Sequence, residues 1–139
     1  MSLFVKSKLS LTIEGAKHIA KAAISEASNN GWNITVTILD EGGHLMYLER
    51  MDGCQTGSIT VSQRKAECAY KFKRPSKAMA DLVANGSVNM MSLPGNLPVE
   101  GGLPLVQDGQ VIGAIGISGV TSVQDGIVAA AGVRVLENA

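Results

Sequence analysis

Residues 101–119 constrain the fold more than any other stretch, because they predict a β-hairpin with one arm covered on both faces. Asp108-Gly109 forms the turn, since both central positions of a type I′ turn require positive φ. The arm before the turn contains Pro104, which cannot donate to a ladder, so this arm lies at an edge or pairs on one side only. The arm after the turn is apolar at successive positions, as in strands buried on both sides. Gly113 and Gly116 are expected to let a helix or another backbone approach it closely.

Patterns elsewhere in the chain predict one more hairpin and four helices. The expected elements are a helix from Thr12 to 29–31, strands over 32–40 and 44–50, a helix from Thr56 or Ser58 to Lys73, a short helix from Ser76 to Val83, and a last helix beginning at 122–125. Hairpins that alternate with helices indicate an antiparallel sheet with helices on its faces, which is the α+β class.

Local sequence signals predict the core-facing side of the first helix, the start of the last helix and one long loop. An apolar stripe marks the core-facing side of the first helix, formed by Ile13, Ala16, Ala20, Ile24 and Ala27. Residues 122–125 match an acidic capping box and so predict the start of the last helix. Residues 87–102 form a long loop with one possible short strand at 97–99, and loops of this length are often functional.

Composition argues against several kinds of partner. Lys and Arg number 12 and Asp and Glu number 12, so the net charge gives no reason to expect nucleic acid or an anionic membrane surface. No apolar run approaches the ~18 residues of a membrane span, and the first residues lack a signal-peptide pattern. We therefore expect a cytoplasmic protein with one domain over residues 1–139. Cys54 and Cys68 are too few for a disulfide framework and fit no zinc pattern.

Association between copies of the chain is also expected. The net charge is zero and 45% of the residues are hydrophobic, a combination that suits a protein hiding surface in an assembly. Residues 129–132 of the last helix are small, so a neighbouring helix can approach them closely. Both features predict a homo-oligomer.

Several separate motifs in collinear order resemble the GlcG/HbpS family, to which the C-terminal domain of PduO-type proteins belongs. The resemblance covers roughly residues 9–136. The motifs are DEGGHL at 40–45, RMDG at 50–53, KA at 65–66, RPS at 74–76, GGLP at 101–104, VIGAIGISG at 111–119 and QD at 124–125. The resemblance implies a profilin-like three-layer α/β/α fold with a five-stranded antiparallel sheet, and homo-oligomers. It also implies haem binding in some members, gene neighbourhoods for glycolate, diol or glycerol use in others, and no agreed catalytic reaction.

His18 is the first candidate functional residue. On the first helix it falls opposite the apolar stripe, and an isolated histidine there is ordinarily a solvated surface residue. The resemblance favours a second interpretation, because haem-binding relatives place a histidine on this helix, so His18 becomes a candidate ligand of haem iron. Lys17 and Lys21 are then candidates to meet the haem propionates. Met90 or Met91 in the long loop is a candidate second axial group, although nothing fixes its position.

A second candidate site is a ligand pocket at the ends of the predicted strands and loops, where pockets commonly form. Its predicted lining is Arg50, Gly101, Gly102, Ser118 and Asp125. The competing interpretation is that Arg50 and Arg74 pair with Asp52 and Asp125 and merely hold loops together.

A catalytic site has less support. Ser118, His44 and Asp40 provide a nucleophile, a base and a group to orient the base, but no nucleophile elbow or other spacing joins them. The sequence therefore favours a haem-binding or small-ligand-binding accessory module, related through the resemblance to diol, glycerol or glycolate metabolism. An assembly protein without a cofactor and a weak enzyme acting on a small oxygenated metabolite stay open as alternatives.

Overall fold

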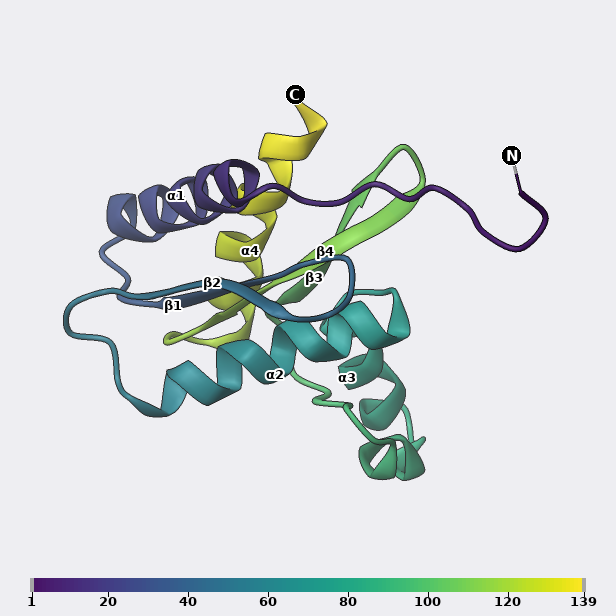
Figure 1. The fold of residues 1–139 in the computed structure, drawn as a ribbon. Coiled ribbons are helices and arrows are strands. Elements are labelled where there is room, and N and C mark those ends of the chain that lie inside the picture. Colours follow the sequence, from purple (N-terminus) through teal and green to yellow (C-terminus); the bar gives the residue numbers. More distant parts are fainter. Residues whose placement is uncertain (1, 139) are drawn as a thin grey trace.

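The computed structural model in Figure 1 describes residues 2–138. Its elements in chain order are α1 (Ile13–Asn29), β1 (Thr35–Leu39), β2 (Leu45–Arg50), α2 (Gly57–Phe72), α3 (Ser76–Ala84), the 3-10 helix η1 (Val88–Ser92), β3 (Gly102–Gln107), β4 (Gln110–Ser118) and α4 (Ser122–Glu137). The strands form one antiparallel sheet in the order β2-β1-β4-β3. The predicted α+β class and both hairpins are confirmed.

The turn between β3 and β4 has the backbone that its sequence predicted. Asp108 has φ 50° and Gly109 has φ 75°, so both central residues are left-handed. β4 pairs with β1 on one side and β3 on the other, and residues 112–118 are buried. This strand is therefore at the centre of the sheet.

The expectation of five strands is wrong, because the described part of the chain forms four. The segment 97–99, the possible extra strand, is irregular. Pro98 has no N–H to donate, and the N–H of Val99 bonds back to the carbonyl of Leu97 at 2.8 Å. Neither residue therefore offers its N–H to a neighbouring strand. The likeness to profilin stays a prediction.

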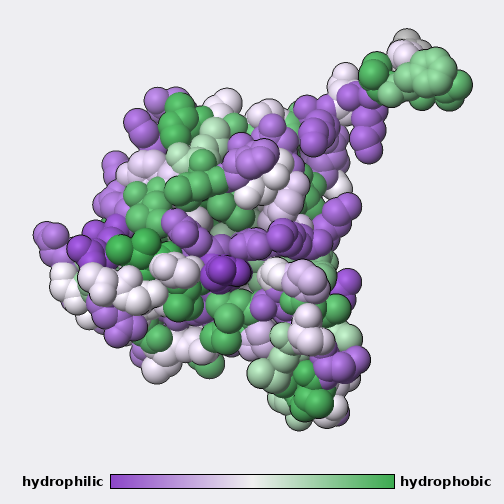
Figure 2. Space-filling view, turned by 60° about the horizontal axis from the view of Figure 1, so that its bottom comes forward, coloured by the Kyte–Doolittle hydropathy of each residue, from purple (hydrophilic) through white to green (hydrophobic). Residues whose placement is uncertain are grey.

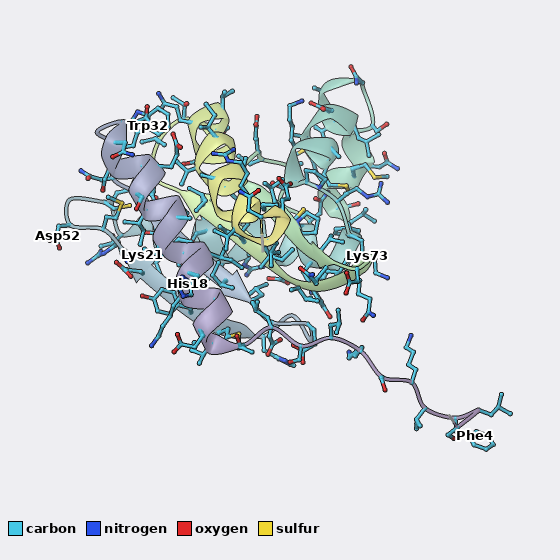
Figure 3. All side chains as sticks on the ribbon, turned by 90° about the horizontal axis from the view of Figure 1, so that it is seen from above. Phe4, His18, Lys21, Trp32, Asp52 and Lys73 are labelled. Carbon is cyan, nitrogen blue, oxygen red and sulfur yellow. The ribbon has the colours of Figure 1, made fainter. Side chains whose placement is uncertain are left out.

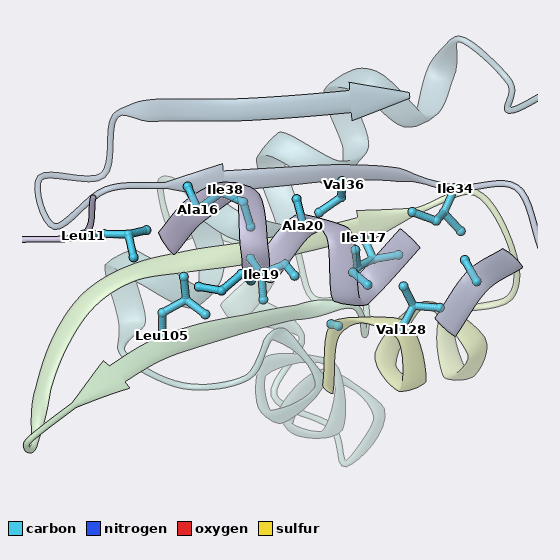
Figure 4. Packing of buried hydrophobic residues seen from close by; sticks show 14 of the residues in the cluster. Leu11, Ala16, Ile19, Ala20, Ile34, Val36, Ile38, Leu105, Ile117 and Val128 are labelled. Carbon is cyan, nitrogen blue, oxygen red and sulfur yellow. The ribbon is translucent and has the colours of Figure 1, made fainter. Parts of the chain in front are cut away.

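Helices cover both faces of the sheet. Figure 1 shows α1 and α4 on one face and α2, with α3 beside it, on the other. The main apolar core lies between the sheet and the α1–α4 pair, as Figure 4 shows from close by. It is built from aliphatic side chains, among them Ile19, Ile34, Val36, Ile38, Leu105, Ile117 and Val128.

The buried stripe of α1 is rotated from the predicted one. Ile13 is 44% exposed, whereas Ile19 and Ala23 are buried beside Ala16, Ala20 and Ala27. Gly132 of α4 lies against α1, because a Cβ there would come within 3.2 Å of the Ile19 carbonyl oxygen. The small residues of α4 therefore serve packing within one copy of the chain, and they no longer argue for an oligomer contact.

The α2 face of the sheet is packed by backbone and small polar groups. A Cβ on Gly116 would overlap the carbonyl oxygen of Ser62, so α2 rests directly on the β4 backbone. A Cβ on Gly113 would likewise overlap the Leu39 carbonyl oxygen of β1. Both glycines allow the close backbone approach that the sequence predicted. The hydroxyls of Thr37 and Ser62 share a hydrogen bond of 2.8 Å within this layer.

Two helix starts differ from their predictions by one residue. The capping box of α4 is formed by Thr121 and Gln124, not by residues 122–125, because Thr121 has the extended backbone of an N-cap. Ser76 lies inside α3 after Pro75, and its hydroxyl donates to the Val99 carbonyl at 2.6 Å.

None of the described helices combines the length and the apolar character that a membrane span requires.

Candidate functional site

His18 is exposed to solvent whereas its neighbour Ile19 is buried, so His18 lies on the outer face of α1; Figure 3 labels it beside Lys21 on this helix. Lys21 follows one turn later on the same face, and Lys17 is four residues before Lys21. Within residues 2–138, no hydrogen bond or ion pair involves these three side chains. An accessible imidazole flanked by two ammonium groups suits a metal-bearing anion such as haem.

Met90 and Met91 both lie in η1, which contacts α3 on the α2 side of the sheet. α1 is on the opposite side, packed on α4, β1 and β2. Within one copy of the chain, neither methionine is therefore placed to ligate the same iron as His18.

The second candidate site is organised by a buried ion pair. Nζ of Lys65 in α2 lies 2.9 Å from Oδ2 of Asp125 in the first turn of α4, and each side chain is 2% exposed. Oδ1 of Asp125 also accepts the N–H of Val120 at 3.2 Å. Burial raises the pKa of the Asp125 carboxyl, while the hydrogen bond and the charge of Lys65 oppose that shift. The pair joins the two helical layers across the end of the sheet.

Four of the five predicted pocket residues come together near this ion pair. A Cβ on Gly101 would lie 2.9 Å from Nζ of Lys65, and one on Gly102 would overlap the Lys65 carbonyl oxygen. Ser118 is buried and donates to the Ser58 hydroxyl at 3.1 Å. Because the Lys65 side chain fills the space beside Gly101 and Asp125, this part of the site is closed.

Arg50 is separate from the other four residues. It pairs with Thr35 across the β1–β2 ladder, and Thr35 pairs with Ser118 on its other side. Arg50 therefore lies two strands away from Ser118, and it is exposed. The interpretation that arginines hold the loops is also wrong for Asp125, whose partner is Lys65.

The buried position of Lys65 was not predicted, although the sequence contains a signal for it. Ser58, Ser62, Lys65 and Ala69 recur at helical spacing and form the buried stripe of α2. The residues of that stripe are small or polar, so it does not stand out in a search for large apolar residues at helical spacing. A single lysine within a stripe of small residues was the available indication of a buried charge.

Of the three side chains considered for catalysis, Ser118 lies apart from the other two. β1 and β4 are antiparallel, with Thr35 opposite Ser118, so Asp40 lies beyond the other end of this ladder. His44 is 81% exposed and sits 3.4 Å from Asp40, far from the buried Ser118 hydroxyl. Cys54 and Cys68 are free and buried. Among the described residues, no cluster of three His, Cys, Asp or Glu side chains suits a metal ion.

Comparison with known proteins places this fold and sequence in one family. Residues 11–134 match the family described as "Haem degrading protein HbpS-like". Protein GlcG of Escherichia coli strain K12 is 40% identical over 114 residues, which are 82% of this chain and 85% of GlcG.

Two solved structures agree with this assignment. A double mutant of Streptomyces reticuli HbpS is 28% identical, with a TM-score of 0.89 over 98% of this chain and 93% of that chain. A PduOC–haem complex is 25% identical, with a TM-score of 0.82 over 91% of this chain and 94% of that chain. The resemblance found in the sequence motifs is thus confirmed, and the chain belongs to the HbpS-like family.

Proposed function

We propose that this protein binds haem on the outer face of α1, with His18 as the residue that would hold the iron. The observation that carries the proposal is the free, exposed imidazole of His18 in a chain similar to a protein solved with haem. Lys17 and Lys21 flank it and are the candidate partners of the propionates. Bound haem would supply an iron centre and a strong Soret band.

The α1 face by itself covers only one side of a flat ligand, so we propose that a second copy of the chain covers the other side. Surface apolar side chains support a homo-oligomer. Phe4 is 90% exposed near the start of the N-terminal segment, and Figures 2 and 3 show this start of the chain standing clear of the fold. Figure 2 also shows apolar side chains on the lobe formed by α3 and η1, where Val88 and Met91 are exposed. Patches of this kind commonly mark contacts with another protein.

The second candidate, a small ligand held among Gly101, Gly102, Ser118 and Asp125, has less support. These residues are buried, and Lys65 occupies the space beside them. A ligand there would have to displace a paired lysine from Asp125. We therefore place the cofactor site on α1 and propose an accessory role in the use of small oxygenated molecules such as glycolate or diols.

The test is a haemin titration of the purified protein, followed by its Soret band, with His18→Ala and with His44→Ala as the matched control. His44 is the other histidine of the chain and is 81% exposed, so its replacement controls for nonspecific histidine binding. We expect His18→Ala to move the Soret band and to weaken binding at least roughly tenfold, and His44→Ala to behave as the unchanged protein.

Identical spectra for the unchanged protein and His18→Ala would refute His18 as the ligand. Free-haemin absorbance in every sample would refute haem binding as a whole, and an assembly protein without a cofactor would then be the better description. Lys17→Gln/Lys21→Gln tests the propionate contacts separately, because it should weaken haemin binding without moving the Soret band.

A further inference from the structure

We propose that a cavity beside Tyr70, at the C-terminal end of α2, binds a small organic anion that also carries a hydroxyl group. The cavity measures about 680 Å³ and lies between the N-terminal segment, the end of α2 and the tip of the β3–β4 hairpin. Its volume is in the range of small-molecule sites. It is separate from the α1 face, so the proposal does not depend on haem binding.

The walls of this cavity are strongly basic. Lys6, Lys8, Lys71 and Lys73 line it, and Glu41 is the one acidic residue among the lining residues. Lys71 is paired with Glu67 at 2.8 Å. In the described part of the chain, no carboxylate lies within 4.0 Å of the ammonium groups of the other three lysines. Three uncompensated cations around one hollow favour an anionic occupant.

The position of Lys73 supports a functional use of its side chain. Lys73 caps α2 with φ 54° and ψ 40°, the left-handed conformation in which glycine or asparagine is usual. A lysine here is conformationally disfavoured relative to glycine, yet it contributes an ammonium group to the cavity. Backbone strain of this kind gathers at ligand sites.

Glu41 is the group that we expect to recognise the hydroxyl of the ligand. Its Oε2 is buried and has no hydrogen-bond partner, the one such side-chain atom among the described residues. Its backbone carbonyl accepts the Tyr70 hydroxyl at 2.8 Å, which ties the β1–β2 turn to α2. Gly43 of this turn lies against the Tyr70 ring, since a Cβ there would come within 2.6 Å of Cε2. Glu41 also lines the cavity, so a small rotation of its carboxylate would bring Oε2 to a ligand hydroxyl, which would supply the donor that this oxygen lacks.

These contacts define the chemical class of the ligand. Lysine ammonium groups are flexible point charges, so they accept carboxylate or phosphate alike. Glu41 would repel a second anionic group at its own position and would accept a hydroxyl there. The class is therefore a hydroxycarboxylate or a phosphate ester with a free hydroxyl.

The experiment compares malate with succinate by isothermal titration calorimetry, because the two dianions differ only in one hydroxyl. Glycerol 3-phosphate tests the phosphate source. We expect 1:1 binding of malate, weaker binding of succinate, and a loss of roughly tenfold in malate affinity in Lys73→Gln. Lys77→Gln is the matched control, since Lys77 is an exposed lysine of α3 paired with Asp81.

Two further variants locate the contacts. Lys6→Gln/Lys8→Gln changes only the exposed N-terminal segment, so it leaves the folded core intact and should also weaken malate binding. Glu41→Ala should abolish the preference for malate over succinate while succinate still binds. Equal affinity for the two dianions in the unchanged protein would overturn the role of Glu41.

Two other results would overturn the site itself. One is the absence of saturable binding by malate, succinate and glycerol 3-phosphate up to ~10 mM, where even weak specific sites fill. The other is an equal effect of Lys73→Gln and Lys77→Gln, which would assign the binding to general surface charge.

Discussion

Replacing Lys65 by methionine should destabilise the protein by about 3–5 kcal/mol, because it leaves the Asp125 carboxylate buried without its partner. Lys65 and Asp125 are 2.9 Å apart and each is 2% exposed, so neither group is compensated by water. Methionine keeps most of the length of the lysine side chain, so the variant removes the charge with little change in volume.

The size of the effect follows from the geometry. Two unit charges 2.9 Å apart attract by about 6 kcal/mol at an effective dielectric constant of about 20. The penalty for burying each ion is several kcal/mol and offsets most of this attraction, so the intact pair adds little net stability. Removing one partner leaves the other ion buried, with its desolvation penalty no longer offset by the attraction. For 139 residues the total stability is on the order of 7–20 kcal/mol, so the loss is a substantial fraction.

The assay is urea unfolding of the unchanged protein, Lys65→Met, Asp125→Asn and the double variant. Asparagine retains an oxygen that accepts the Val120 N–H, so Asp125→Asn removes the charge and keeps that bond. The double variant leaves no buried charge. Its loss should therefore be smaller than the sum of the two single losses by at least about 2 kcal/mol.

The pH dependence has a definite sign. Burial raises the pKa of Asp125 above its ordinary 3.8, so the folded protein binds this proton more tightly than the unfolded chain does. The stability gained from protonating Asp125 is therefore present below pH 3.8 and is lost as the pH rises through the folded pKa. Without Lys65 the pKa of Asp125 rises further, so the deficit of Lys65→Met should be smaller at pH 5 than at pH 8. Additive single losses, or a loss below about 1 kcal/mol in Lys65→Met, would refute a coupled buried pair.

Three shorter predictions concern other parts of the fold. Gly116→Ala should lower the free energy of unfolding in urea by at least about 3 kcal/mol, because its Cβ would overlap the Ser62 carbonyl. In the control Gly57→Ala the new Cβ meets no atom within 4 Å, so this variant should be neutral or stabilising. Equal losses of stability in the two variants would contradict this packing. Asp40→Ala should cost about 1 kcal/mol at neutral pH. Burial raises the pKa of Asp40, but the N–H groups of His44 and Gly42 and the His44 charge together lower it by more, so the net pKa is below its ordinary value. The stability that the ionised carboxylate contributes is therefore lost as the pH falls through the folded pKa, and the cost of Asp40→Ala should shrink over that range. Phe4→Ser should shift the protein toward smaller assemblies in light scattering, and an unchanged mass would exclude the N-terminal segment from the interface.

The elements set by local chemistry were predictable from the sequence. Asp108-Gly109 specifies its turn through two positive φ angles, and Gly31 ends α1 in the left-handed conformation for the same reason. These signals act over a few residues, so they can be recognised without knowledge of the fold. The family assignment also came from the sequence, since its motifs keep their order along the chain.

The arrangement of α2 depended on tertiary structure. Gly116 indicated a close approach but could not specify the partner, which is the backbone at Ser62. Only when α2 lies on the β4 backbone does Lys65 become buried and need an anion. The number of strands was decided in the same way, because the segment 97–99 bonds to α3 and to itself instead of joining the sheet.

The sequence by itself determined the turns, most helices, the hairpins and the histidine exposed on α1. The tertiary structure decided that Lys65 pairs with Asp125, 60 residues away, and that Glu41 and Lys73 share one cavity. The physical reason is range: a turn or a helical stripe is encoded by neighbours in the chain. A buried ion pair or a ligand cavity instead requires groups from distant segments, and their distances exist only after the layers have packed.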